Sequence, residues 1–247
     1  MSLQRCGIDA VSAALDTMQD GGDTVELVLA QKEVSDDRLD ALLSRCEEMG
    51  VEITYGSDSD LWRMAIGTIP GSAPPLALAL VGRDPTGDLS QVLARGGLVW
   101  MLAGAQYSSN VGYCIRMAEV SGADAILVAG DWSNSDRHQA VRAAMRTHRF
   151  LPVIWCGPPL DAVAQAKQAG MSVVGIEDVG DVEPWDSDLT GDLLLIIGGE
   201  NEGIPTEVLE ACDSVIRIPM AGFTPSYNLQ APMAIVAVEA LRQRRDE

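Results

Sequence analysis

Apolar runs of strand length recur through the last two-thirds of the chain and alternate with stretches of helical periodicity. Runs that are almost wholly apolar, such as 193–197, are typical of parallel strands that helices cover on both faces. The predicted strands are 98–102, 125–128, 151–155, 172–176, 193–197 and 215–218, and the predicted helices are 111–120, 135–146, 160–170, 205–211 and 231–245. This alternation predicts an α/β fold with a mostly parallel sheet and helices on both faces.

A shorter pattern of the same kind precedes these elements. Its predicted helices are 8–18, 36–49 and 61–66, and its predicted strands are 25–29, 51–54 and 76–81. The run from Arg83 to Asp88 combines Pro, Gly and Asp, which marks a break between folded segments. We therefore expect a small α/β domain at 1–83, a linker at 84–95 and a larger domain at 96–247.

The composition is that of an ordinary globular protein, with 47% hydrophobic and 21% charged residues. No stretch approaches the roughly 20 apolar residues of a membrane span, and no signal pattern opens the chain, so a cytoplasmic protein without membrane contact is expected. The five cysteines are scattered and form no CxxC or Cys/His spacing, which argues against a disulfide framework and against a metal site.

The formal charge of −19 argues against a nucleic-acid partner, because phosphate contacts normally require a basic surface. One segment departs from this average. The thirteen residues from 137 to 149 contain both histidines and no acid, and they include Arg137, Arg142, Arg146 and Arg149. A solvated helix face and a site for an anionic ligand such as RNA are about equally compatible with this run.

Polar residues that the hydrophobic pattern does not require follow three predicted strands. The first loop leads through Asn110, Gly112 and Arg116, and we expect Asn110 to cap a helix that begins at position 111. The second is a glycine-rich turn with Gly198, Glu200 and Gly203. The third runs from Ile218 through Pro219, Met220 and Gly222 to Ser226, Tyr227 and Asn228. In open parallel sheets, ligands gather at the carboxyl ends of the strands, where these loops would lie.

The order and spacing of these three motifs resemble the SpoU/TrmH-type RNA 2'-O-methyltransferases of the SPOUT superfamily. The resemblance covers about residues 95–245. Residues 7–81 resemble, more weakly, the small substrate-binding domain that often precedes the catalytic domain of this family. Tyr107-Ser108, Tyr227 and Asn201 depart from the family pattern, and so do the residues around His148, where a Ser/Gly-rich piece is usual.

The resemblance implies an RNA methyltransferase that uses S-adenosylmethionine to methylate a ribose 2'-hydroxyl of ribosomal or transfer RNA. It also implies a C-terminal trefoil knot and a homodimer. By carry-over, the catalytic residues are Arg116, Asn110, Glu200, Ser226 and Asn228, and the cofactor-binding residues are Gly198, Ile218, Met220 and Tyr227. Arg116 would serve either as the base or as a phosphate clamp, and the second role suits a guanidinium, which holds its proton tightly.

Two alternatives from other classes stay open at this point. The acidic charge favours a small-molecule α/β enzyme with a nucleotide cofactor, although neither GxGxxG nor GxxxxGK[ST] is present. The other alternative is a non-catalytic RNA-binding module that retains the fold, against which the presence of Arg116, Glu200 and Asn228 argues.

Overall fold

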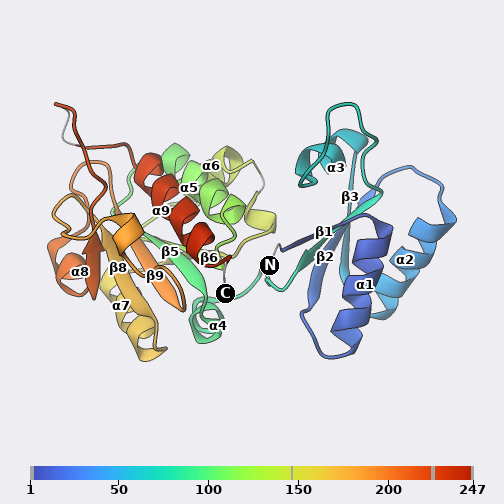
Figure 1. The fold of residues 1–247 in the computed structure, drawn as a ribbon, viewed down its shortest axis with the longest axis horizontal. Coiled ribbons are helices and arrows are strands. Elements are labelled where there is room, and N and C mark those ends of the chain that lie inside the picture. The colour runs from blue at the N-terminus through green and yellow to red at the C-terminus, as the bar shows by residue number, and fades with distance from the viewer. Residues whose placement is uncertain (1–2, 146, 224–225, 246–247) are drawn as a thin grey trace. The chain divides into compact units, whose positions relative to one another are not determined.

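The computed structural model describes residues 3–145, 147–223 and 226–245, and the chain forms two compact units, Met1–Asp84 and Pro85–Glu247 (Figure 1). Each unit has its own sheet and its own hydrophobic core. Within the described ranges, the helices are too short or too polar for any of them to cross a membrane.

The first unit is a four-stranded mixed sheet with the order β1-β4-β2-β3. Its strands are β1 (Gln4–Cys6), β2 (Val25–Gln31), β3 (Glu52–Gly56) and β4 (Ala77–Val81), and its helices are α1 (Ile8–Gln19), α2 (Asp37–Glu48) and α3 (Asp58–Met64). Strand β2 runs parallel to β3 and antiparallel to β4. Buried residues of α1 and α2 pack with those of β2 and β4 in one core, while α3 contacts β2 and β3.

The second unit is a six-stranded sheet with the order β10-β8-β9-β5-β6-β7. Its strands are β5 (Leu98–Ala103), β6 (Ala125–Ala129), β7 (Val153–Cys156), β8 (Ser172–Ile176), β9 (Leu193–Gly198) and β10 (Ser214–Ile216). All five strand pairs are parallel, which confirms the predicted parallel sheet. Every residue of β5, β6 and β9 is buried, as their unbroken apolar runs require.

Helices cover both faces of this sheet. The helices are α4 (Leu89–Arg95), α5 (Ser108–Val120), α6 (Asn134–Ala143), α7 (Pro159–Gln168), α8 (Thr206–Glu210) and α9 (Gln230–Gln243), with two 3₁₀ turns, η1 (Thr147–Arg149) and η2 (Pro184–Asp186). Alternate residues of each strand divide between two cores: α5, α6 and α9 close one, and α4, α7 and α8 close the other. Figure 1 shows α9 lying along α5, and the two helices are in contact.

Apart from the two 3₁₀ turns, two short elements were not predicted. Strand β1 has three residues and pairs only with β4, so it carries too little periodicity to be seen in the sequence. Helix α4 lies inside the expected linker at 84–95, and its Val92 and Leu93 are buried in the core of the second unit. The Asp88–Gln91 capping box that begins α4 was a usable signal, because this spacing is a helix-start signature.

Close packing joins α5 to α6. A Cβ atom on Gly112 would lie 2.4 Å from the carbonyl oxygen of Ala140 and 2.5 Å from Cβ of Ala143, so only glycine fits here. Gly112 is therefore a helix-contact residue. Its role in the first sequence motif is to let α6 approach α5.

The C-terminal end of α9 is tied to the segment that leads into β9. The side chain of Gln243 accepts from the Leu189 amide at 2.8 Å and donates to the Ser187 carbonyl at 3.0 Å. Arg244 Nε donates to the Leu189 carbonyl at 2.9 Å. The last helix is thus fixed both to α5 and to a connection that precedes it by about fifty residues. The trefoil knot implied by the family resemblance stays a prediction.

Candidate active site

The loops after β5 and β9 begin side by side at one edge of the sheet. Strands β5 and β9 are parallel neighbours, and their last residues, Ala103 and Gly198, are partners. A Cβ atom on Gly199 would lie 1.8 Å from the carbonyl oxygen of Gly104, and one on Gly198 would lie 2.1 Å from the carbonyl carbon of Gly203. These glycines are needed because backbone meets backbone where the two loops cross.

A chain of hydrogen bonds connects the first two polar loops at this edge to the start of α9. The Asn110 side-chain amide donates to Glu200 Oε1 at 2.6 Å, and the Gln106 backbone amide donates to Glu200 Oε2 at 3.0 Å. From the other side, Gln230 Nε2 donates to Asn110 Oδ1 at 2.9 Å. We call Gln230–Asn110–Glu200 the amide relay. It joins the start of α9, the first turn of α5 and the turn after β9.

Asn110 does not cap α5 as the sequence suggested. The helix begins at Ser108, its N-cap position is Tyr107, and no side chain caps it. Asn110 lies within the first turn, where its side-chain amide donates to Glu200 and accepts from Gln230. The sequence predicted a cap at Asn110 and a helix start at position 111, but the helix begins three residues earlier, at Ser108.

Cys114 lies one turn after Asn110 and is buried. Burial and the nearby Glu200 carboxylate raise the pKa of the Cys114 thiol to about 12. This cysteine therefore stays protonated at physiological pH and packs as a small apolar side chain beside the amide relay.

The third loop follows β10 and exposes apolar side chains. Ile218 is buried, whereas Met220 and Tyr227, the other predicted cofactor contacts from this loop, are exposed. The Tyr227 hydroxyl donates to the Pro219 carbonyl at 3.1 Å, which closes the loop on itself. Gly198, the remaining predicted cofactor residue, lies against the backbone of Gly203, so the absence of its side chain serves the turn itself.

Ser226 and Asn228 are exposed in the same loop. Asn228 Oδ1 accepts from the Ala231 amide at 3.2 Å, so this side chain satisfies a backbone donor in the first turn of α9. In the described part of the chain, neither side chain forms a hydrogen bond with Arg116, Asn110 or Glu200. The catalytic set predicted from the sequence is therefore divided: the structure joins Asn110 to Glu200 and leaves Ser226, Asn228 and Arg116 apart from them.

Arg116 lies two turns into α5 and is exposed. Its Nη1 atom contacts the sulfur of Met145 at 2.8 Å, a weak acceptor. Among the residues that the structure describes, no carboxylate pairs with this guanidinium. It is therefore available for an anionic group of a ligand.

The predicted RNA-binding arginines differ in their surroundings. Arg137 is partly buried: its Nε atom donates to the Trp132 carbonyl at 3.1 Å, and its Cζ atom lies 5.4 Å from the Trp155 ring centroid. Arg142 and Arg149 are exposed, on α6 and in η1 respectively. Arg146 lies outside the described residues. The structure thus gives Arg137 a packing role and leaves Arg142 and Arg149 as surface cations.

His148 lies in η1, which packs against α5. Its Nδ1 atom is buried without a hydrogen-bond partner. Burial first, and the neighbouring Arg149 second, lower the pKa of His148. The imidazole is therefore neutral at physiological pH and adds no positive charge to the basic run.

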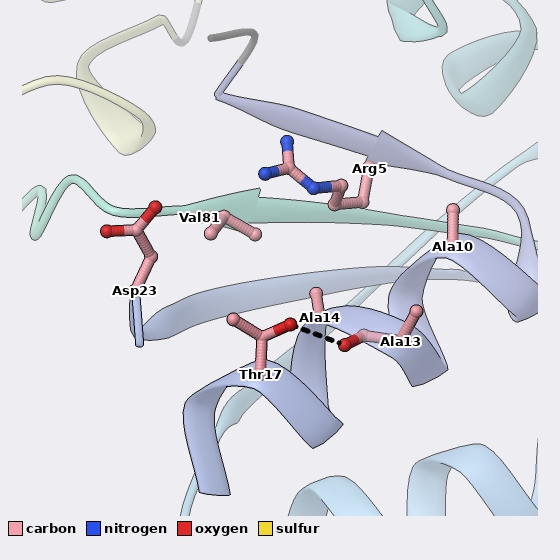
Figure 2. Close-up of a pocket in the computed structure, with 7 residues that line it drawn as sticks. All are labelled: Arg5, Ala10, Ala13, Ala14, Thr17, Asp23 and Val81. Atoms are coloured by element: carbon pink, nitrogen blue, oxygen red, sulfur yellow. Dashed lines mark hydrogen bonds between the residues drawn. The ribbon is translucent and has the colours of Figure 1, made fainter. Parts of the chain in front are cut away.

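A pocket of about 300 Å³ belongs to the first unit and is separate from these loops. Figure 2 shows Ala10, Ala13, Ala14 and Thr17 of α1 along one side, with Arg5 and Asp23 near Val81 on the other. The Thr17 hydroxyl donates to the Ala13 carbonyl at 3.0 Å, so it is used within the helix. The walls are mostly methyl groups, and we assign this pocket no part in the chemistry.

Comparisons with known proteins follow the same division of the chain. A model of the SpoU rRNA Methylase family matches residues 97–238. The 23S rRNA (guanosine-2'-O-)-methyltransferase RlmB of Photobacterium profundum is 30% identical over 244 residues, which cover 97% of both chains. The protein of the same name from Escherichia coli K12 is 29% identical over 99% of this chain and 100% of its own.

A solved structure is similar over almost the whole chain. The SpoU methyltransferase AviRb from Streptomyces viridochromogenes, in complex with the cofactor AdoMet, has a TM-score of 0.58 and is 27% identical. The match covers 98% of this chain and 90% of that chain. The polar residues of the three loops all lie within the family match.

Proposed function

The chain belongs to the SpoU rRNA methylase family, and from this premise we propose that it transfers a methyl group from S-adenosylmethionine to a ribose 2'-hydroxyl of ribosomal RNA. The observation that carries the proposal is the amide relay, because it joins the first two sequence motifs, which follow the neighbouring parallel strands β5 and β9, to the start of α9 directly after the third motif. The names of the relatives support RNA of the large ribosomal subunit as the substrate, and a ribosomal substrate would be met in the cytoplasm. The family sets aside a small-molecule enzyme with another nucleotide cofactor.

The donor fits the loops after β9 and β10. Main-chain groups of the turn at Gly198–Gly203 and the exposed side chains of Met220 and Tyr227 would hold it, with Ile218 buried beneath. When bound, S-adenosylmethionine supplies an electrophilic methyl group on a sulfonium sulfur. The residues of this chain then have to bind the RNA, orient the 2'-oxygen and accept or release its proton.

We assign Arg116 the role of phosphate clamp. An arginine guanidinium is positively charged, and the exposed N–H groups of Arg116 can donate two hydrogen bonds to one phosphate. Such a clamp would fix the ribose next to the phosphate and would stabilise the 2'-oxygen as its proton passes to solvent water and the methyl group is transferred from the sulfonium sulfur. Ser226 and Asn228, exposed on the third loop, are the proposed ribose contacts.

The RNA would also contact Arg142 and Arg149, which form an exposed cationic strip on α6 and η1 within a strongly acidic protein. A local strip suffices because screening limits the reach of surface charges to about 8 Å at physiological salt. The negative charge elsewhere would confine RNA to this strip, where the acid-free run from 137 to 149 lies.

We further propose that the protein is a homodimer. Tyr113 and Val120 of α5 and Ile235 and Val238 of α9 are exposed, and Val120 and Val238 keep 72% and 66% of their surface accessible. The two helices are in contact, so these side chains lie on neighbouring elements. An exposed apolar face on packed helices is typical of a surface that a second copy covers.

The test combines donor binding with methyl transfer. S-adenosylhomocysteine at about a hundred times its Kd should raise the free energy of unfolding by about 2.7 kcal/mol, seen as a melting shift of several degrees. With labelled S-adenosylmethionine, the protein should methylate a ribosomal RNA transcript but not DNA of the same sequence, since DNA lacks the 2'-hydroxyl. Absence of both the melting shift and the label would exclude the proposed activity.

A further inference from the structure

Gln230 takes part in the site although no sequence motif pointed to it. It is the first residue of α9, directly after the loop that carries Ser226 and Asn228. Its Nε2 atom lies 2.9 Å from Asn110 Oδ1, and Asn110 Nδ2 lies 2.6 Å from Glu200 Oε1. All three side chains are half-buried. Gln230 therefore closes a three-residue path from α9 to the turn after β9.

The direction of each hydrogen bond in this path is determined by the carboxylate. An ionised Glu200 only accepts, and it receives the Gln106 amide on one oxygen and the Asn110 amide on the other. Asn110 must therefore turn its NH₂ group toward Glu200 and its oxygen toward Gln230. At position 230 the path then requires a donor, and the glutamine NH₂ group supplies it.

We propose that Gln230 is a positioning residue: by donating to Asn110 it fixes the orientation of the asparagine amide and locks the three loops of the donor site together. Without this bond, the Asn110 amide can rotate, and the start of α9 has one fewer contact with the loops after β5 and β9. The assignment rests on the proposed function, because it takes these loops to bind the methyl donor. Gln230 itself needs no contact with RNA or donor in this role.

A single substitution tests the required polarity. Gln230→Glu keeps the shape but places a carboxylate opposite Asn110 Oδ1, so that one hydrogen bond fails whichever way the amide turns. We expect the affinity for S-adenosylhomocysteine to fall about tenfold or more, as for loss of a hydrogen bond coupled to a charge. Gln230→Met, which removes the donor without adding charge, should lower the affinity as well.

The pH dependence of S-adenosylhomocysteine affinity shows whether a variant at position 230 loses affinity through the broken relay or through a general loss of structure. Protonation of the introduced carboxyl restores a donor toward Asn110, so the affinity of Gln230→Glu should recover as the pH falls toward about 5. Gln230→Met has no group to protonate and should show no such recovery. The wild-type protein has no carboxyl group at position 230 and should not gain affinity either.

The decisive variant reverses the whole relay. In Glu200→Gln combined with Gln230→Glu, the Asn110 amide can turn around, donate to the carboxylate at position 230 and accept from the amide at position 200. The Gln106 amide still finds an oxygen to bind. We expect this double variant to regain S-adenosylhomocysteine affinity to within about threefold of wild type, although Gln230→Glu alone loses tenfold or more.

The same four proteins yield a double-mutant cycle in donor affinity and in melting temperature. Losses that simply multiply in the double variant would overturn the proposal, and so would an unchanged affinity in Gln230→Glu. If the wild-type protein fails to bind S-adenosylhomocysteine, the proposed function fails. In that case the melting temperatures still decide whether Gln230, Asn110 and Glu200 are coupled.

Discussion

Arg116 and Asn110 lie on the same helix but differ in how many contacts they make with the rest of the protein. Asn110 is held by two neighbours of complementary polarity, whereas Arg116 has only a sulfur atom as its partner among the described residues. A residue with few contacts in the protein contributes little to its stability and is free to bind a ligand. In the first motif, Asn110 thus holds the loops together, and Arg116 is a candidate ligand contact.

The first prediction concerns Arg116→Ala. Because the side chain is exposed, its loss should change the free energy of unfolding by less than about 0.5 kcal/mol and leave donor binding intact. The rate of methyl transfer should drop by at least about a hundredfold. Arg116→Lys should restore little of this rate, because an ammonium group cannot form the bidentate hydrogen bonds of a guanidinium with a phosphate. Methyl incorporation and melting temperature are measured together. Activity within a few-fold of wild type in the alanine variant would remove Arg116 from the mechanism.

The second prediction uses the lowered pKa of His148. Burial holds this pKa below the usual 6.5, so the unfolded chain takes up a proton before the folded protein does. Stability that is fully present above about pH 6.5 should therefore be lost as the pH falls toward the lowered pKa. Melting curves between about pH 7.5 and 5 should show this loss in wild type and a smaller one in His148→Asn. The same change at exposed His138 controls for loss of a histidine, and identical pH profiles for wild type and His148→Asn would contradict the prediction.

At the scale of elements, α6 and η1 illustrate how a charged run in a sequence divides in space. Arg137 covers the Trp155 ring, and Trp132 and Trp155 are themselves packed with ring centroids 5.7 Å apart. This cluster fixes the start of α6 against the sheet edge. Arg142 and Arg149 remain at the surface, so only part of the run is available to phosphates.

The third prediction concerns RNA affinity. Replacing Arg142 and Arg149 together with Gln should weaken RNA binding several-fold at moderate salt, and the slope of log affinity against log salt should flatten by about one for each lost phosphate contact. Donor affinity should not change. Arg242→Gln, which removes an exposed arginine already paired with Glu239, is the matched control. Equal salt slopes for the double variant and wild type would show that RNA binds elsewhere.

Much of the second unit could be predicted because its strands are long apolar runs that must be buried on both faces. The predicted strand at 172–176 coincides with β8, and the other predicted strands overlap observed ones. Position 110 was harder to interpret, since a polar residue before an apolar stripe resembles a helix cap, and only the position of Glu200 reveals its role. Gln230 was missed because its partner is 120 residues away in the chain.

At the scale of the whole molecule, the apolar faces of α5 and α9 are the feature that one copy alone does not explain. Val120 and Val238 stay largely exposed, although α5 and α9, the helices that carry them, are in contact with each other. A symmetric interface would bring each face against its own copy, as two-fold contacts require.

The fourth prediction tests this assembly with Val238→Glu. A carboxylate at the centre of an apolar interface is strongly disfavoured, so the variant should sediment as a monomer at concentrations where wild type is a dimer. Its melting should resemble that of wild type at low protein concentration, because Val238 is exposed in the single chain. Equal sedimentation of wild type and variant as monomers would contradict the proposed homodimer. Val179→Glu, at an exposed valine outside both helices, is the matched control.

The strand order of the second unit also has a consequence for synthesis of the chain. Strand β5 is made early, yet its neighbour β9 arrives about ninety-five residues later, since Leu98 pairs with Leu193. Translation adds about 5–20 residues per second. The edge of β5 that will pair with β9 therefore stays without its partner strand for roughly 5–20 seconds. During that interval the nascent chain exposes a template for wrong pairing. In the first unit the latest pairing is that of Gln4 with Leu80, about 76 residues later, and the waiting strand β1 has only three residues, none of them buried. Newly made chains that aggregate should therefore do so through the second unit, and a chaperone that binds during translation should act on the stretch between β5 and β9.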